Sequence, residues 1–200
     1  MGLGLAAGEL SSSDEPPVLM VLGDSLSAGY DIDIEQGWVR LLQARLEMQG
    51  LDHRVINASI SGDTTRGALA RLPQAMRDSR PKIVIVELGG NDGLRGLSLA
   101  ETKTNLSAII DAIITGGARV LLLGIRLPPN YGPAYTKRFE TIFVDLADQH
   151  SVPLVPFLLD GVALDPALMQ DDGLHPRANA QPALLDNVWP SLKRLIQPDS

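Results

Sequence analysis

The chain has 200 residues, of which 44% are hydrophobic and 20% charged, and its 17 basic and 24 acidic side chains give a net charge of −7. This length and composition indicate one soluble globular domain with a sizeable core. The acidic balance argues against a nucleic-acid partner, which would need a basic face. No apolar run approaches the roughly 18 residues of a membrane span, so we expect no stable membrane insertion. Cysteine is absent, which excludes disulfides and thiol nucleophiles.

The first 17 residues differ in composition from the rest of the chain. A glycine-broken apolar stretch is followed by an acidic segment rich in serine and proline. An intact secretory leader would have a basic start and a longer apolar core. We therefore expect residues 1–17 to form a flexible or processed end and residues 18–200 to form the domain.

From Val18 onward, apolar strand-like runs alternate with amphipathic helix-like segments. In chain order, the pattern predicts a strand at 18–22, a helix at 38–48, a strand at 54–57, a helix at 65–78 with Pro73 near its middle, a strand at 83–86, a helix at 99–115, a strand at 120–125, a helix at 135–150, a strand at 152–157 and a helix at 179–196. Strands that are apolar on both faces and alternate with helices favour a parallel sheet covered on both sides. We therefore expect a single-domain, three-layer α/β/α sandwich.

The first polar island, Gly23-Asp24-Ser25-Leu26-Ser27, directly follows the first predicted strand. Gly23 allows a sharp turn, and Ser25 can then present its hydroxyl at the first turn of a helix. The alternative interpretation is that Ser25 only caps that helix, which serine does well. The segment is not a Gly-x-Ser-x-Gly nucleophile elbow, because position 27 is serine.

Two further islands follow the second and third predicted strands. Asn91 comes after Gly89-Gly90, and Gly62 follows the strand that ends near Asn57. The carboxyl ends of parallel strands meet at one edge of a sheet, so both residues should lie near Ser25. A side-chain amide and backbone N–H groups at that edge could bind an oxyanion. The alternative is ordinary turn chemistry, since asparagine and glycine both favour loops.

Histidine is the usual general base near neutral pH, and the chain has three. We expect His53 and His150 to be surface residues. His175 lies in Asp171-Asp172-Gly173-Leu174-His175-Pro176, where a carboxylate three residues earlier can hold the imidazole in one tautomer. A solvated Asp-Gly turn with a chance histidine is the competing interpretation.

Taken together, these islands resemble the motifs of the SGNH (GDSL) hydrolase superfamily, and most closely its bacterial TesA-type arylesterase, thioesterase I and lysophospholipase L1 group. The similar segments occur in the family's order at 22–30, 57–64, 87–96, 125–132 and 170–176. The resemblance implies nucleophile Ser25, base His175, orienting Asp172, and an oxyanion hole formed by Ser25, Gly62 and Asn91. It also implies a five-stranded, flavodoxin-like parallel sheet and a periplasmic or secreted location, with a cytoplasmic one left open. The three scattered histidines offer no metal-ligand spacing, and we expect no metal or other cofactor.

The expected activity is hydrolysis of small-molecule acyl esters or thioesters, including aryl esters and lysophospholipids, through an acyl-enzyme on Ser25. Apolar loops after the third and fourth strands could hold the acyl chain, with Leu94, Leu127 and Tyr131 as candidate pocket residues. The same loops could instead only cover the core. Two alternatives remain open: a carbohydrate O-acetylesterase on the same scaffold, and a flavodoxin-like binding module, which would leave Asp172 and His175 without a role.

Overall fold

Five parallel strands form the centre of the structure, a computed structural model that describes residues 15–197. They lie in the order β2-β1-β3-β4-β5, so the chain runs from β1 outward to β2 and then returns to the other side of β1 with β3. This is the flavodoxin-like order that the motifs implied. The expectation of a flexible or processed end falls mainly on residues 1–14, which lie outside the described residues.

The strands are β1 (Val18–Gly23), β2 (Arg54–Asn57), β3 (Ile83–Glu87), β4 (Arg119–Leu123) and β5 (Leu154–Val155). The helices are α1 (Ser25–Ala28), α2 (Trp38–Met48), α3 (Thr65–Ser79), α4 (Gly90–Leu94), α5 (Leu99–Thr115), α6 (Pro133–His150) and α7 (Gln181–Ile196), with single 3-10 turns at Ile34–Gln36, Pro129–Tyr131 and Ala178–Ala180.

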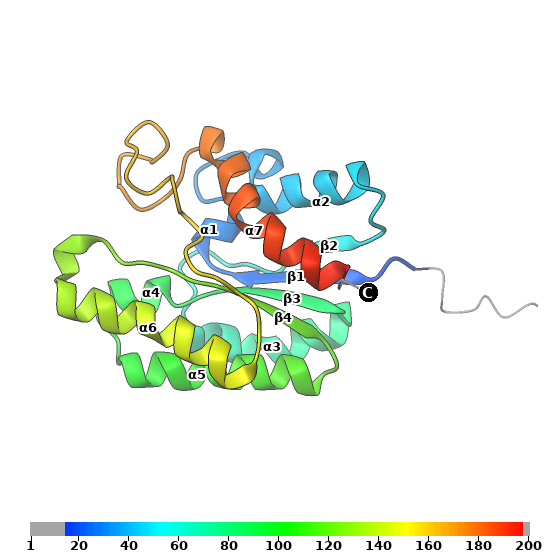
Figure 1. Cartoon of the computed structure of the whole chain (residues 1–200), viewed down its shortest axis with the longest axis horizontal. Helices are drawn as coiled ribbons and strands as arrows, with labels where there is room; N and C mark the ends of the chain where they lie inside the picture. Colours follow the sequence, from blue (N-terminus) through cyan, green and yellow to red (C-terminus); the bar gives the residue numbers. More distant parts are fainter. Residues whose placement is uncertain (1–14, 198–200) are drawn as a thin grey trace, which may run out of the picture.

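Helices cover both faces of the sheet (Figure 1). Side chains alternate along a strand, so Leu19 and Val21 of β1 pack against α2 and α7 on one face. Met20 and Leu22 face the other way, toward α3, α5 and α6. Both layers of side chains are fully buried, which is why the strands read as continuous apolar runs.

Some boundaries differ from the sequence expectation. The fourth strand ends at Leu123, two residues before the predicted end. Gly124 passes so close to the Pro156 carbonyl that a side chain there would collide with it. The fifth strand is only two residues long, since prolines flank it and lack the N–H of a sheet ladder. Helix α3 runs through Pro73, which lies on its exposed face.

The loops that follow the strands meet at the carboxyl edge of the sheet, at the point where the strand order reverses between β1 and β3. The described ends of the chain lie at the opposite, amino edge. There the Pro17 carbonyl accepts a hydrogen bond from the Arg54 N–H, and the Arg119 guanidinium at the start of β4 contacts the Leu195 carbonyl of α7. Figure 1 shows the end of α7 beside the start of β1.

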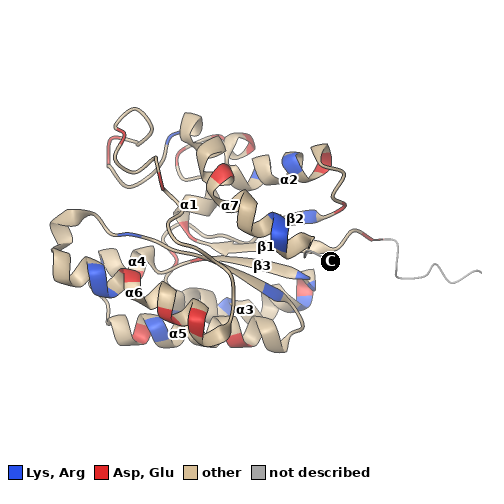
Figure 2. Ribbon diagram, in the orientation of Figure 1, with Lys and Arg blue, Asp and Glu red and all other residues tan. Residues whose placement is uncertain are grey.

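Between residues 15 and 197, no helix has both the length and the apolar character to cross a bilayer. Acidic and basic residues are interspersed along α5 and α6 (Figure 2). Lys103 and Asp145, for example, pair across these helices at 2.6 Å.

Candidate active site

Ser25 is the first residue of α1, and only Asp24 separates it from the end of β1 at Gly23. Asp24 is the N-cap, and its Oδ1 accepts a hydrogen bond from the Leu26 N–H at 3.1 Å. Asp24 therefore performs the capping role that the sequence left open for Ser25. The Ser25 N–H is one of the N-terminal amides without an intrahelical acceptor, and its hydroxyl is available to a partner.

That partner is His175, whose Nε2 lies 2.9 Å from Ser25 Oγ. His175 Nδ1 lies 2.6 Å from Asp172 Oδ2, and Asp172 Oδ1 accepts hydrogen bonds from the backbone N–H groups of Leu174 and His175. An ionised carboxylate only accepts, so the ring proton is assigned to Nδ1 and Nε2 is free to accept from the serine hydroxyl. Hydroxyl, imidazole and carboxylate thus stand in one chain of hydrogen bonds.

Asp172 is held in its ionised form. Burial acts to raise its pKa, but hydrogen bonds from the His175 side chain and from two backbone amides outweigh burial and lower the pKa of Asp172 to about 2. The carboxylate therefore stays charged across the neutral range and keeps the imidazole in place.

Asn91 lies in the first turn of the short helix α4. The residue before this helix, Gly89, has a left-handed backbone conformation with φ of 112°. Asn91 Nδ2 donates to Asp24 Oδ2 at 3.1 Å, and Asn91 Oδ1 is 3.4 Å from Arg95 Nη2. The same Arg95 nitrogen donates to the Gly62 carbonyl at 2.9 Å. Gly62 is exposed and has φ of 80°, and Arg95 ties it to Asn91.

A cavity of about 190 Å³ opens beside Ser25. Its polar side is formed by Asp24, Ser25, Asn91 and His175. Its other lining residues are mostly apolar and come from five segments: Leu26, Gly90, Leu94, Ile125, Arg126, Leu127, Pro128, Leu159 and Leu174.

Two of the three candidate pocket residues, Leu94 and Leu127, line this cavity. Tyr131 lies outside its lining, and its hydroxyl instead donates to the Leu94 carbonyl at 3.0 Å. Tyr131 therefore braces the carboxyl end of α4, where Leu94 lies. Ile125 and Leu159 also line the cavity and were not among the predicted pocket residues. Ile125 was assigned to the end of the fourth strand, and Leu159 follows the fifth predicted strand and belongs to no motif.

The sequence analysis also missed Tyr30. Its ring packs against the His175 imidazole with centroids 4.3 Å apart and planes tilted by 32°. Gln170 joins the two segments, because its side chain donates to the Tyr30 carbonyl and its backbone N–H donates to the His175 carbonyl. The available signal was that Tyr30 is an aromatic residue five positions after Ser25, in the same motif.

The expectation that His150 is a surface residue is wrong, since only 7% of its side chain is exposed. The ring packs between α5 and α6, where Nε2 lies 2.9 Å from Ser107 Oγ and Nδ1 lies 3.2 Å from Asp111 Oδ1. His53 is half-buried, and burial lowers its pKa.

Ser107, His150 and Asp111 repeat the residue types of the first constellation but lack its surroundings. Ser107 lies in the middle of α5, where backbone N–H groups are committed to intrahelical hydrogen bonds. Free N–H groups that could stabilise a negative oxygen are therefore found beside Ser25 and not beside Ser107.

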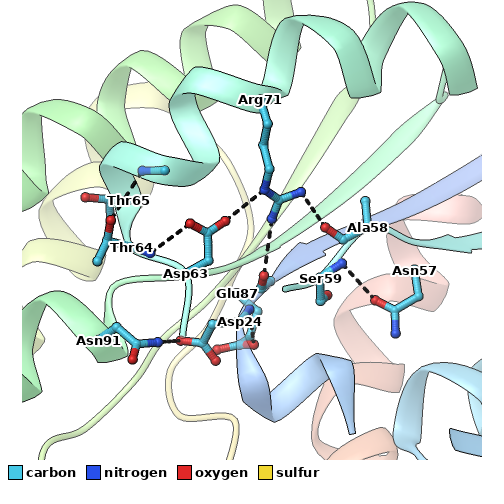
Figure 3. A network of polar contacts seen from close by, with 12 residues as sticks. Asp24, Asn57, Ala58, Ser59, Asp63, Thr64, Thr65, Arg71, Glu87 and Asn91 are labelled. Carbon is cyan, nitrogen blue, oxygen red and sulfur yellow. Dashed lines mark hydrogen bonds and ion pairs between the residues drawn. The ribbon is translucent and has the colours of Figure 1, made fainter. Parts of the chain in front are cut away.

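Arg71 of α3 braces the carboxyl edge of the sheet (Figure 3). Its Nε pairs with Asp63 Oδ2 at 2.8 Å, and its Nη1 and Nη2 donate to the Ala58 and Gly23 carbonyls. One side chain thus ties the ends of β1 and β2 and the loop that contains Gly62 to α3, at the edge of the sheet that carries Ser25.

Comparisons with known proteins point to one family. A model of the GDSL-like lipase/acylhydrolase family matches residues 21–181. The chain is 50% identical over 192 residues to esterase TesA of Pseudomonas aeruginosa, covering 96% of both chains. It is 44% identical over 182 residues to thioesterase 1/protease 1/lysophospholipase L1 of Escherichia coli strain K12, covering 91% of this chain and 86% of that relative.

A crystal structure of TesA matches the fold with a TM-score of 0.88 at 53% identity, covering 89% of this chain and 99% of that chain. The resemblance inferred from the motifs and the predicted parallel-sheet sandwich are both confirmed. The chain belongs to the GDSL-like lipase/acylhydrolase family.

Proposed function

We propose that this protein is a serine esterase that hydrolyses carboxylic esters through an acyl-enzyme on Ser25. Family membership supports ester hydrolysis as the reaction class. The observation that carries the proposal is the 2.9 Å contact between Ser25 Oγ and His175 Nε2, continued at 2.6 Å to Asp172. A flavodoxin-like binding module would have no use for this arrangement.

In the first step, Ser25 Oγ attacks the acyl carbonyl carbon while its proton passes to His175 Nε2. Asp172, ionised and bonded to Nδ1, stabilises the imidazolium that forms. The carbonyl π electrons move to oxygen, and collapse of the tetrahedral intermediate expels the alcohol or thiol, which takes the proton from His175. Water then repeats the sequence on the acyl-enzyme and releases the acid.

The tetrahedral oxygen would be stabilised by the Ser25 N–H, the Gly62 N–H and the Asn91 side-chain amide. Asn91 Nδ2 carries two hydrogens, and Asp24 uses only one of them. Asn91 lines the cavity together with Ser25, and we assign the second hydrogen to the oxyanion. Every proposed step uses side chains, backbone N–H groups and water, so the proposal requires no metal or cofactor.

We assign the acyl chain of the substrate to the apolar part of the cavity, against Leu94, Ile125, Leu127 and Leu159. The substrates would accordingly be aryl esters, acyl thioesters and lysophospholipids with a hydrocarbon acyl group. A carbohydrate O-acetylesterase would transfer only an acetyl group and would leave this apolar wall unused.

A hydrolysis panel tests the proposal. Acyl chain length would be varied from acetyl upward on a fixed phenol leaving group, and phenol, thiol and lysophospholipid leaving groups would then be compared at the preferred length. Ser25→Ala is the blank. Stoichiometric labelling of wild-type protein, but not of Ser25→Ala, by a phosphonate ester is expected. Labelling of both proteins, or hydrolysis by Ser25→Ala at the wild-type rate, would refute the assignment of the nucleophile.

The periplasmic or secreted location implied by the motifs stays a proposal. Cell fractionation of the native host, with antibody detection and cytoplasmic and periplasmic marker enzymes, tests it. Recovery of the protein solely with the cytoplasmic marker would contradict it.

A further inference from the structure

Two acidic side chains are buried together directly beneath Ser25. Asp24 is 2% exposed and Glu87 is fully buried, and the β1–β3 register pairs Glu87 with Gly23. Neither carboxyl forms an ion pair with a basic side chain between residues 15 and 197. Two adjacent carboxylates in such a place would be strongly disfavoured by burial and by mutual repulsion.

The hydrogen bonds of Glu87 identify where a proton would reside. Its Oε2 accepts from Ser27 Oγ at 2.8 Å and from the Asp24 N–H at 3.3 Å. Its Oε1 is buried and receives no hydrogen bond from any described residue. A buried carboxylate oxygen without a donor is costly, whereas a protonated oxygen is itself a donor. The Asp24 carboxyl group, which lies close enough to Glu87 for each to shift the pKa of the other, is the acceptor that we assign to this proton.

The hydrogen bonds of Asp24 indicate the opposite state. Its Oδ1 accepts from the Leu26 N–H, and its Oδ2 accepts from Asn91 Nδ2, both at 3.1 Å. Figure 3 shows Asn91 pointing its amide nitrogen at this carboxylate. Because each of these neighbours donates, Asp24 is best satisfied as an acceptor-only carboxylate.

Two glycines of the motifs make room for this pair. A Cβ at Gly23 would lie 2.9 Å from Glu87 Oε2, and a Cβ at Gly90 would lie 3.3 Å from Asp24 Oδ2. The backbone of β1 and α4 thus closes around the two carboxyl groups.

We propose that Asp24 and Glu87 share one proton, carried by Glu87, and that the resulting acid–carboxylate pair positions the Asn91 amide in the oxyanion hole. The proposal rests on the function proposed above for Asn91. An asparagine amide can turn over with little steric change, and its oxygen would then face the substrate. An ionised Asp24 accepts only from the nitrogen, so it holds the amide in the orientation that an oxyanion requires.

Burial raises the pKa of Glu87 well above its usual range, and the nearby Asp24 charge raises it further. Burial also raises the pKa of Asp24, to about 6, while hydrogen bonds from Leu26, Glu87 and Asn91 oppose the increase. The other charged or titratable groups near the pair are His175, which lowers the pKa of Asp24, and Arg71, Asp63 and Asp92 on the loops and helices around it.

Carbon-13 NMR of the Glu and Asp side-chain carboxyl groups measures the protonation state directly, and it can be done on Ser25→Ala protein without any substrate. Signals are assigned by their loss in Glu87→Gln and Asp24→Asn. We expect the Glu87 carboxyl to keep the chemical shift of a neutral acid through pH 8, with Asp24 ionised. A Glu87 carboxylate that titrates near its ordinary pKa of about 4.3 would overturn the proposal.

Unfolding by denaturant at several pH values gives a second readout. The folded state would keep a proton that the unfolded chain releases above about pH 4.3, so the wild-type unfolding free energy should fall as pH rises. Glutamine mimics the neutral acid and does not titrate. As pH rises, the unfolding equilibrium constant of wild type should therefore increase relative to that of Glu87→Gln by up to about tenfold per pH unit. Glu101→Gln makes the same chemical change on the surface and is the matched control. An advantage of Glu87→Gln that does not change with pH would contradict the shared proton.

Kinetics test the positioning role. We expect kcat of Glu87→Gln to exceed that of Glu87→Ala by at least about tenfold at similar KM, because glutamine can still donate to Asp24. Equal values in the two variants would overturn the positioning role. If Ser25 is not the nucleophile, the phosphonate experiment fails while the NMR result stands, so the two proposals fail separately.

Discussion

Ser25 Oγ and His175 Nε2 lie 2.9 Å apart although 150 residues separate them in the chain. Their contact depends on β1 delivering the serine to the carboxyl edge of the sheet and on the loop before α7 returning to that edge. The first prediction concerns this contact. Ser25→Ala should lower kcat by about 10⁴-fold or more with little change in the unfolding midpoint.

The control for this substitution is Ser107→Ala, which removes the serine of the second Ser–His–Asp set. Since α5 offers no free N–H groups beside Ser107, this variant should retain wild-type turnover and phosphonate labelling. Loss of activity in Ser107→Ala with a native fold would mean that the wrong serine has been assigned.

The second prediction concerns the oxyanion donor. Among the described residues, Asn91 is the one that lines the cavity with a side-chain amide. Asn91→Ala should lower kcat by about 10²–10³-fold, with KM changed far less. The measurement is steady-state kinetics on an activated ester. An increase in KM alone would indicate that Asn91 binds the ground state rather than the transition state.

The third prediction concerns Arg95, an exposed residue that donates to both Gly62 and Asn91. Arg95→Met keeps the aliphatic stem but removes the two hydrogen bonds. We expect kcat to fall by about tenfold, which corresponds to a loss of about 1.4 kcal/mol of transition-state stabilisation. The free energy of unfolding should stay unchanged. Equal kcat in variant and wild type would show that the two donors are fixed without Arg95.

The fourth prediction concerns pH. The pKa of Asp172 is about 2 in the folded protein and about 3.9 in the unfolded chain, so its stabilising contribution is complete above the unfolded pKa and is lost as pH falls through 2. The stability difference between wild type and Asp172→Asn should therefore be constant above about pH 5 and shrink toward pH 2. Denaturant unfolding at each pH measures it, and a difference that grows on acidification would contradict the assignment.

The fifth prediction concerns acyl chain length. Leu127 is 6% exposed, lines the cavity and packs against Gly93. Leu127→Ala should shift the preferred acyl chain toward greater length, at a cost of about 2–5 kcal/mol in the free energy of unfolding. Leu164→Ala is the control, because Leu164 is 92% exposed and lies outside the cavity lining. Identical length profiles in the two variants would remove Leu127 from the pocket.

Much of the fold could be predicted from the sequence because the central strands β1 and β3 are apolar on both faces and polar residues follow them within a few positions. That pattern placed Ser25 and Asn91 at the same sheet edge, as the structure does. Helix α4 could not be predicted, since Gly89-Gly90 and Gly93 are poor helix formers and the helix forms only where it packs against Leu127 and Phe139.

The carboxyl pair could not be predicted either. The sequence pattern predicted that the third strand ends at Val86, whereas β3 continues to the fully buried Glu87. Acidic side chains are rarely buried, so the apolar pattern does not include this residue. Its partner Asp24 lies 63 residues earlier, so only the β1–β3 register brings the two together. An acidic residue between a β-branched strand and a pair of glycines was the available signal.

Some of the cavity residues could be predicted from the sequence and others could not. Leu94 and Leu127 lie within a few residues of the ends of β3 and β4 and could be predicted from their position. Leu159 comes from the loop after β5, whose path depends on tertiary packing. Tyr131 was placed near the pocket by its loop, but its hydroxyl turned out to bond the Leu94 backbone. Position along the chain fixes which loop a side chain belongs to, and packing decides where it points.

The carboxyl end of α7 and the start of β1 lie at the amino edge of the sheet, with the length of the strands between them and Ser25. A solid support coupled beyond α7 would thus hold the molecule with the cavity beside Ser25 facing the bulk solvent. Immobilised preparations made in this orientation should accept bulky or aggregated lipids as readily as the free enzyme does.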